Sequence, residues 1–314
     1  MKILKIVLLL GTVFCCAKSE DIKYAENYQE IFEDVESIKN SLNLLKLKVE
    51  REVHPPKSAS QNYAEREKYR NQSKPIFDIR IDELPKECQN HASPPSNCAM
   101  ATACTETSGY YNITVSRYRN HTFQVFCDYR TKGGDWLHIL QRIDGLENFN
   151  RPWMDYVNGF GAVDGEYWIG LENLYALTNF DGPQELYVYM HNFSGAMRYA
   201  RYDHFVIGGA DEKYKLKVLG KYSGNAGDSL SYSLGAAFTT FDEDNDNHTQ
   251  NCATAHKGGW WYKSCARTVP TGFYHLAKYK GEFADGIYWR DWLELWNSMK
   301  HVVMMIRRQR IFED

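Results

Sequence analysis

Residues 242–265 read Asp-Glu-Asp-Asn-Asp-Asn-His-Thr-Gln-Asn-Cys-Ala-Thr-Ala-His-Lys-Gly-Gly-Trp-Trp-Tyr-Lys-Ser-Cys. An acidic run opens this stretch, and a Gly-Gly-Trp-Trp-Tyr motif lies between two cysteines, Cys252 and Cys265. Four acidic side chains lie within five positions, residues 242–246, and such close like charges repel unless they are solvated or hold a cation. A solvated turn and a cation site both remain open on these residues alone.

The N-terminus has the pattern of a secretory signal peptide. Lys2 and Lys5 precede an apolar run over residues 6–14, and the small residue Ala17 closes a cleavage site. The run is shorter than the ~20 apolar residues that cross a bilayer, so membrane insertion is not expected. We therefore predict a signal peptide over residues 1–17 and a secreted, extracellular protein.

The remaining cysteines and the glycosylation sequons agree with export. Six cysteines are left after the signal, and an even number in an exported chain favours disulfides: Cys88, Cys98, Cys104, Cys127, Cys252 and Cys265. A zinc site is less favoured because the chain has no Cys-x-x-Cys pair. Five Asn-x-Ser/Thr sequons are candidate glycosylation sites: Asn71, Asn112, Asn120, Asn192 and Asn247. The net charge of −3 gives no basic surface for a nucleic-acid partner.

An oligomerising stalk is predicted after the signal. Between residues 24 and 49 the apolar positions alternate in spacings of four and three: Tyr24, Tyr28, Ile31, Val35, Ile38, Leu42, Leu45 and Val49. This heptad seam predicts a coiled coil over residues 20–53 that makes the protein a homo-oligomer, with dimer and trimer both open. His54-Pro55-Pro56 ends the helix, and residues 54–78 are typical of a linker.

From residue 79 to 311 the pattern is that of one large α+β domain. Short β-branched and aromatic runs predict strands, mostly antiparallel, at residues 123–126, 136–140, 185–189, 214–218 and 301–306. Residues 152–158 and 171–177 are the candidate helices. The C-terminal third is expected to consist mainly of long loops.

This domain closely resembles the fibrinogen C-terminal domain of ficolins, tachylectins, angiopoietin-like proteins and many invertebrate lectins. The resemblance covers roughly residues 83–310 and rests on motifs in family order: Val125-Phe126-Cys127-Asp128, Gly133-Gly134-Asp135-Trp136, Gly165-Glu166-Tyr167-Trp168-Ile169-Gly170, Asn251-Cys252-Ala253, Gly258-Gly259-Trp260-Trp261-Tyr262 and Asp285-Gly286-Ile287. It implies a disulfide-bound N-terminal hairpin, a central antiparallel sheet with short helices, and a loop-built recognition part. It also implies the disulfide Cys252–Cys265 and a bridge from Cys127 to an upstream cysteine. Cys98 best matches the usual partner, with Cys104 left open in its place, and Cys88–Cys104 would be an additional pair that the family does not guarantee.

The resemblance implies that the acidic run binds calcium. In the family, the aspartates eight and six residues before the first cysteine ligate Ca²⁺, and these positions are Asp244 and Asp246. The backbone carbonyls that match the family's further ligands belong to His248 and Gln250. Hard oxygen ligands suit Ca²⁺, which tolerates irregular coordination. Its role would be to hold the recognition loops.

A ligand pocket is implied beside the second cysteine. The residues expected to form it are His256, Tyr262, Ser264, Cys265, Ala266, Phe283 and Ala284. In family lectins the peptide bond before the second cysteine is cis, which predicts a cis Ser264–Cys265 bond. His256, Ala266 and Phe283 stand where acetyl-binding members have Tyr, His and Tyr, so a ligand other than an acetylated sugar is plausible at the same place.

These features bear on three classes of function. The first is a secreted, oligomeric, calcium-stabilised, lectin-like protein that binds a glycan or acetylated ligand on cell surfaces, with innate immunity as a possible setting. The alternative is an extracellular ligand for a protein receptor, as in the angiopoietin-like branch, without sugar binding. Catalysis is not expected, because the Gly-Asp-Ser-Leu run at residues 227–230 has no downstream Asp-x-x-His to activate Ser229.

Overall fold

The computed structural model describes residues 95–309 except 104, 277, 280–283 and 294. Several predicted features lie outside the described residues: the signal peptide, the coiled coil, the linker, Cys88, Cys104, Asn71 and Phe283. The predicted domain limits therefore stay predictions. Within the described part of the chain, no helix combines the length and apolarity needed to cross a membrane.

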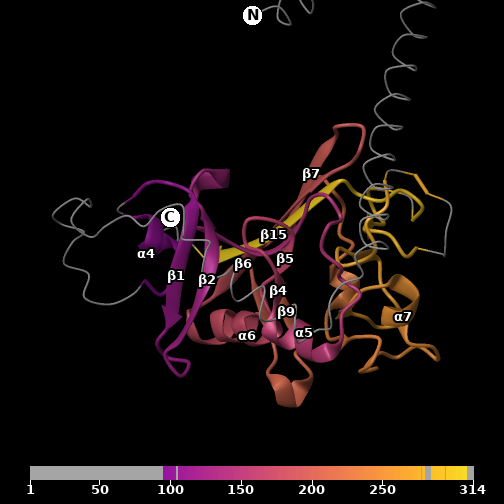
Figure 1. The fold of residues 1–314 in the computed structure, drawn as a ribbon, viewed down its shortest axis with the longest axis horizontal. Helices are drawn as coiled ribbons and strands as arrows, with labels where there is room; N and C mark the ends of the chain where they lie inside the picture. The colour runs from indigo at the N-terminus through magenta and orange to yellow at the C-terminus, as the bar shows by residue number, and fades with distance from the viewer. Residues whose placement is uncertain (1–94, 104, 277, 280–283, 294, 310–314) are drawn as a thin grey trace, which may run out of the picture. The chain divides into compact units, whose positions relative to one another are not determined.

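A nine-stranded antiparallel sheet is the centre of the domain (Figure 1). Seven strands follow one another across it in the order β1 (Gly109–Val115), β2 (His121–Asp128), β3 (Trp136–Arg142), β15 (His301–Arg308), β6 (Gln184–His191), β7 (Met197–Tyr202) and β10 (Tyr222–Gly224). The short strands β4 (Phe160–Gly161) and β5 (Tyr167–Trp168) branch from β3. β15 is the last strand in the sequence, yet it lies in the middle of the sheet between β3 and β6.

Both faces of the central strands are covered, which explains their apolar composition. In β15, Val302, Met304 and Ile306 face the main core, while Met305 packs with Trp136 and Tyr187 on the other face. Successive strand residues point to opposite faces, so the two sets alternate along β15.

Short helices pack against the sheet. They are α4 (Cys98–Thr102), α5 (Trp153–Asn158) and α6 (Leu171–Phe180). Leu171, Leu174 and Leu177 recur at helical spacing on α6 and are buried in the core. The predicted disulfide Cys98–Cys127 is confirmed and joins α4 to β2. The predicted α+β class and both candidate helices are likewise confirmed.

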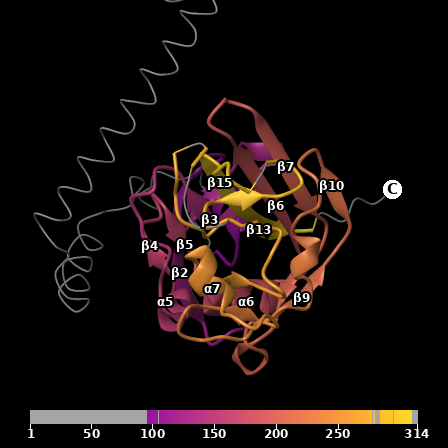
Figure 2. The same cartoon turned by 90° about the vertical axis from the view of Figure 1, so that its right-hand side faces the viewer.

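The C-terminal third consists of loops joined by short pairs of strands, as expected. The pairs are β8 (Phe205–Ile207) with β9 (Leu216–Leu219), β11 (Phe238–Thr239) with β12 (Trp260–Trp261), and β13 (Thr268–Val269) with β14 (Tyr288–Trp289). One short helix, α7 (Cys252–His256), lies among them, and Figure 2 shows α7 and β13 on the side facing the viewer. Single-turn 3₁₀ helices complete the fold at η2 (Thr131–Gly133), η3 (Ala210–Glu212) and η4 (Ser231–Ser233).

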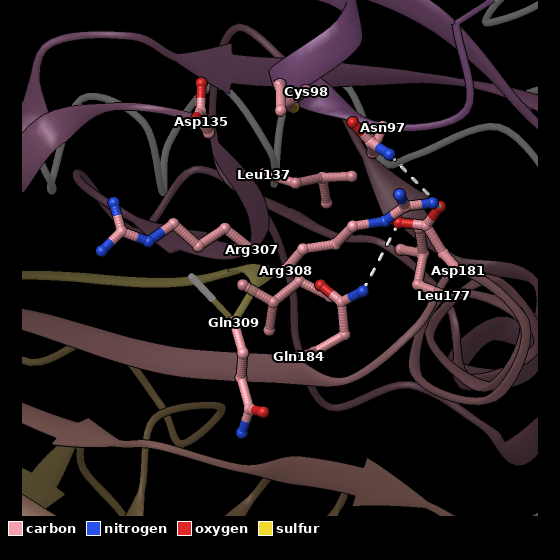
Figure 3. Close-up of a pocket in the computed structure, with 12 residues that line it drawn as sticks. Asn97, Cys98, Asp135, Leu137, Leu177, Asp181, Gln184, Arg307, Arg308 and Gln309 are labelled. Carbon is pink, nitrogen blue, oxygen red and sulfur yellow. Dashed lines mark hydrogen bonds and ion pairs between the residues drawn. The ribbon is translucent and has the colours of Figure 1, made fainter. Parts of the chain in front are cut away.

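A small cavity of about 120 Å³ lies where the described chain begins and ends. Figure 3 shows Asn97, Gln184 and Arg308 turned toward the buried carboxylate of Asp181. Both oxygens of Asp181 are therefore satisfied from within the protein. We interpret this cluster as a structural contact that joins the start of α4 to the end of β15.

Candidate functional site

The Trp-Trp motif forms the core beneath the recognition loops. Trp260 and Trp261 are fully buried, and Trp261 packs edge-on against Phe238 of the neighbouring strand β11. The Trp261 Nε1–H donates a hydrogen bond to the carbonyl oxygen of Tyr214 at 2.8 Å. These two tryptophans hold the loops together and do not face a ligand.

The second predicted disulfide, Cys252–Cys265, is also confirmed, with a Cα–Cα separation of 5.3 Å. It closes the loop that begins with α7, whose N-terminus is capped by Asn251 accepting from the Thr254 N–H at 3.0 Å. The disulfide therefore fixes the position of α7 against the segment that ends at Cys265.

The prediction of a cis bond at Ser264–Cys265 is wrong. No peptide bond in the described residues is cis, and Cys265 instead has a left-handed backbone with φ +55°. The Lys263 N–H donates to the Cys265 carbonyl oxygen at 2.9 Å, so the chain turns within three residues. The left-handed backbone of Cys265 therefore forms the turn at this position.

A cavity of about 490 Å³ lies beside this disulfide. Five of the seven predicted pocket residues line it: His256, Ser264, Cys265, Ala266 and Ala284. Tyr262 does not line the cavity, because it is fully buried and its hydroxyl donates to the Gly258 carbonyl oxygen. Phe283 lies outside the described residues.

Five further residues complete the cavity wall: His248, Ala255, Tyr288, Arg290 and Leu295. Tyr288 and Arg290 reach the cavity because β14 pairs with β13, and β13 begins three residues after Cys265. This pairing joins segments about twenty residues apart, and no local motif signals it. Arg290 adds a full positive charge to the cavity wall, and the pocket residues predicted from the sequence did not include it.

His256 is held in one orientation. Its Nδ1 lies 2.6 Å from the Ala284 carbonyl oxygen, which can only accept, so Nδ1 carries the proton. Burial lowers the pKa of His256, although the Ala284 carbonyl and Asp285 act in the opposite direction. The neutral ring therefore keeps Nε2 as a hydrogen-bond acceptor, and it stacks on Tyr262 at 5.6 Å.

The acidic run divides into two functional halves. Asp242 accepts hydrogen bonds from the Trp153 N–H and the Thr240 hydroxyl, and Glu243 pairs with Lys213 at 2.9 Å. These two carboxylates therefore hold neighbouring segments in place. The other half of the run holds the two predicted calcium ligands, Asp244 and Asp246.

Of the two predicted calcium ligands, Asp244 is exposed and Asp246 is partly buried. Asp246 accepts from the backbone N–H groups of His248 at 2.8 Å and Cys252 at 2.9 Å. Burial raises the pKa of Asp246, the two N–H groups lower it, and repulsion from Asp244 raises it further. Burial is the largest of these effects, so the pKa of Asp246 is raised overall. The hard carboxylate and carbonyl oxygens of this segment fit Ca²⁺ chemically.

One further group of metal-binding residue types occurs in the described residues. A ring nitrogen of His248 and the sulfur atoms of Cys252 and Cys265 lie within 4.8 Å of one another. The two sulfurs form a disulfide, so neither is a thiolate that could ligate zinc. This group is not a metal site.

The Gly-Asp-Ser-Leu run is structural. Ser229 is fully buried, donates to Asp291 Oδ2 at 2.8 Å and accepts from the Asp291 N–H at 3.0 Å. Asp228 accepts from the hydroxyls of Tyr202 and Ser231, both at 2.7 Å. The serine hydroxyl thus bonds to an aspartate and not to a base that could activate it.

The described sequons lie at the surface. Asn112, Asn120 and Asn247 are exposed, and Asn192 is partly buried in the β6–β7 turn, where its Oδ1 accepts from the Ala196 N–H. Asn247 follows the acidic pair directly, so a glycan there would stand next to the candidate calcium site. Whether these sites carry glycans stays a prediction.

Comparison with known proteins assigns the family. The family model described as "Fibrinogen beta and gamma chains, C-terminal globular domain" matches residues 85–309. The chain belongs to this fibrinogen C-terminal family. Fibrinogen-like domain families are non-enzymatic, which agrees with the structural role of Ser229 and with the expectation that the chain is not an enzyme.

The family's angiopoietin-related members are similar to this chain. Angiopoietin-related protein 2 of Mus musculus is 41% identical over 228 residues, which cover 72% of this chain and 46% of that protein. Tenascin of Gallus gallus is 41% identical over 214 residues, covering 68% of this chain and 11% of tenascin. The chain thus spans less than half the length of these curated relatives.

Solved structures agree with the assigned fold. The fibrinogen-like globe domain of human ANGPTL2 is 43% identical, with a TM-score of 0.67, and covers 69% of this chain and 100% of that domain. Lamprey fibrin D-dimer, complexed with the peptide Gly-His-Arg-Pro-amide, is 23% identical with a TM-score of 0.65. At that identity the lamprey protein supports the fold alone.

Proposed function

We propose that this fibrinogen-family protein is a secreted, oligomeric, lectin-like recognition protein that binds glycans on cell surfaces. The cavity beside the Cys252–Cys265 disulfide carries this proposal. It brings small side chains, the fixed acceptor of His256 and the guanidinium of Arg290 together in a volume of about 490 Å³. A few polar groups in a concave, otherwise apolar wall are typical of a small-ligand site.

Calcium would stabilise the segment next to this cavity. Asp244 and Asp246 would hold the ion together with the carbonyl oxygens of His248 and Gln250, and it would supply a fixed positive charge without any chemical step. His248 also lines the cavity, so an ordered 244–250 segment fixes part of the cavity wall. Calcium binding and ligand binding should therefore be coupled.

The predicted coiled coil would make binding multivalent. A single shallow site binds a sugar weakly, and linking several sites in one oligomer raises the overall affinity by ~10²–10⁴-fold. The stalk at residues 20–53 would supply this link, with the linker at 54–78 setting the reach of each domain.

The proposal is tested with the mature oligomer on a glycan array and on intact cells. We expect binding to a defined set of glycans in calcium, loss of that binding in EDTA, and loss of cell binding after enzymatic removal of surface glycans. Cell binding that survives complete deglycosylation while the array stays blank would contradict a lectin function.

A protein-receptor ligand is the second candidate function. The 41% identity to angiopoietin-related protein 2 favours it, as do the three departures from the acetyl-binding pattern at His256, Ala266 and Phe283. This function would keep the calcium segment but would not need the cavity. The same deglycosylation experiment separates the two functions, because a receptor ligand should bind cells through protein alone.

A further inference from the structure

We propose that two neighbouring arginines, Arg267 and Arg290, form an anion subsite that binds the carboxylate or sulfate of an acidic glycan. This inference rests on the proposed glycan binding and names the class of sugar that the cavity selects. Arg290 lines the cavity, and Arg267 follows the cavity residue Ala266 directly in the chain.

The strand pairing brings the two arginines together. Thr268 pairs with Trp289 in β13–β14, and the Arg290 N–H donates to the Arg267 carbonyl oxygen at 2.9 Å, which continues the register by one residue. Residues directly opposite in antiparallel strands carry their side chains on the same side, with Cβ atoms about 4.5–5.5 Å apart. The two arginines therefore leave the pair from one side. Arg290 lines the cavity, while the Arg267 guanidinium lies over the ring of Tyr232.

No carboxylate neutralises them within the part of the chain that the structure describes. Both side chains are exposed, and neither forms an ion pair there. The guanidinium carbon of Arg267 lies 5.7 Å from the centroid of the Tyr232 ring, and Lys263 Nζ lies 5.8 Å from the same centroid. Like charges directly opposite each other destabilise a strand pair, so a bound anion would relieve this repulsion.

The cavity itself is also free of acidic groups among its described lining residues. Two carboxylates from adjacent loops are engaged elsewhere: Asp285 binds His275 at 2.9 Å, and Asp246 binds backbone N–H groups. Neither carboxylate lines the cavity, and among the described lining residues Arg290 carries the one permanent charge. A guanidinium recognises a planar carboxylate or a sulfate through two parallel hydrogen bonds.

The remaining wall favours a sugar over an acidic peptide. His256 presents an acceptor at Nε2, which suits a hydroxyl donor, and a pyranose carries several hydroxyl groups around its ring. The small side chains of Ala255, Ala266 and Ala284 leave room for a sugar ring in a cavity of about 490 Å³. The geometry thus points to an acidic sugar.

The test is titration of the mature protein in calcium with two matched pairs of probes. The pairs are sialyllactose with lactose, and a heparin hexasaccharide with its desulfated, N-acetylated counterpart, so that carboxylate and sulfate recognition are read separately. We expect at least one acidic probe to bind about tenfold or more tightly than its neutral counterpart, and added salt to weaken it. Arg290→Gln and Arg267→Gln should each remove most of this preference.

Arg117→Gln is the matched control, because Arg117 is exposed in the β1–β2 turn and changes the net charge equally. It should leave all affinities unchanged. Equal binding of acidic and neutral probes would overturn the anion subsite while leaving glycan binding intact. An equal loss in the Arg117 variant, or preference for an Asp/Glu-rich peptide over every sugar, would also overturn it. Failure of every probe to bind would instead count against the glycan-binding function as well.

Discussion

Asp246 sits where burial and repulsion from Asp244 raise its pKa, despite two backbone N–H groups that lower it. A carboxyl whose folded-state pKa is raised makes the fold less stable as the pH rises through that pKa. Ca²⁺ binds the charged form and would reverse this effect, so the calcium-dependent rise in Tm should be larger at pH 7 than at pH 4. Free Ca²⁺ at a hundredfold excess over its Kd would stabilise the folded state by ~2.7 kcal/mol.

Thermal melts in calcium-free and calcium-containing buffer at both pH values measure this difference. The double variant Asp244→Asn with Asp246→Asn is nearly isosteric and should show no calcium response at either pH. A calcium shift that is equal at pH 4 and pH 7, or that persists in the double variant, would remove these two residues from the site.

Ala266 lines the cavity, and the resemblance to acetyl-binding lectins implies a histidine at this position. Ala266→His adds a hydrogen-bonding group to the wall, and one hydrogen bond is worth ~0.5–1.5 kcal/mol. We expect this variant to bind N-acetylglucosamine about twofold to tenfold better than the natural protein, as read by titration calorimetry. Ala210→His, at an exposed position on η3, is the control and should change nothing.

At the scale of elements, a buried ion pair connects the sheet to the recognition loops. Arg142 at the end of β3 is fully buried, pairs with Glu166 at 3.3 Å, and donates to the carbonyl oxygens of Pro270 and Gly272 at 3.0 and 2.8 Å. Arg142→Met would leave the Glu166 charge buried without its partner. We expect a loss of ~3–5 kcal/mol in the free energy of unfolding measured in urea.

Replacing both partners, Arg142→Met with Glu166→Met, should cost less than the single change, because no charge is then left unpaired. Lys217→Met is the surface control, since its pair with Glu212 is exposed to solvent and should contribute little to stability. A single Arg142 variant as stable as the Lys217 variant would show that this pair does not hold the loops.

Local patterns were sufficient for much of the fold and part of the site. The alternating and β-branched runs predicted strands at β2, β3, β6 and β15, and the cysteine motifs with the family resemblance led to both described disulfides. Three features depend on long-range pairing and were missed: the place of β15 between β3 and β6, the buried Arg142–Glu166 pair, and Arg290 in the cavity wall. No local spacing encodes which distant strand becomes a neighbour.

At the scale of the whole molecule, the predicted coiled coil should set the oligomeric state. Ile38→Pro places a proline in the middle of the heptad seam, at a cost of ~3 kcal/mol or more to the helix. We expect the full mature chain to be an oligomer by light scattering and this variant to dissociate. A truncated protein beginning at Gln72 should be monomeric, and equal protomer numbers for the full and truncated chains would contradict the role of the stalk.

Recognition by the cavity is tested most directly by filling it. The measurement is calorimetric titration, in calcium, of the glycan that binds most tightly on the array, with the natural protein, Ala266→Trp and the surface control Ala210→Trp. Tm values of all three proteins confirm that the fold is kept. We predict that Ala266→Trp loses binding by at least about tenfold while Ala210→Trp binds like the natural protein. Undiminished binding by a folded Ala266→Trp would show that the ligand is recognised elsewhere.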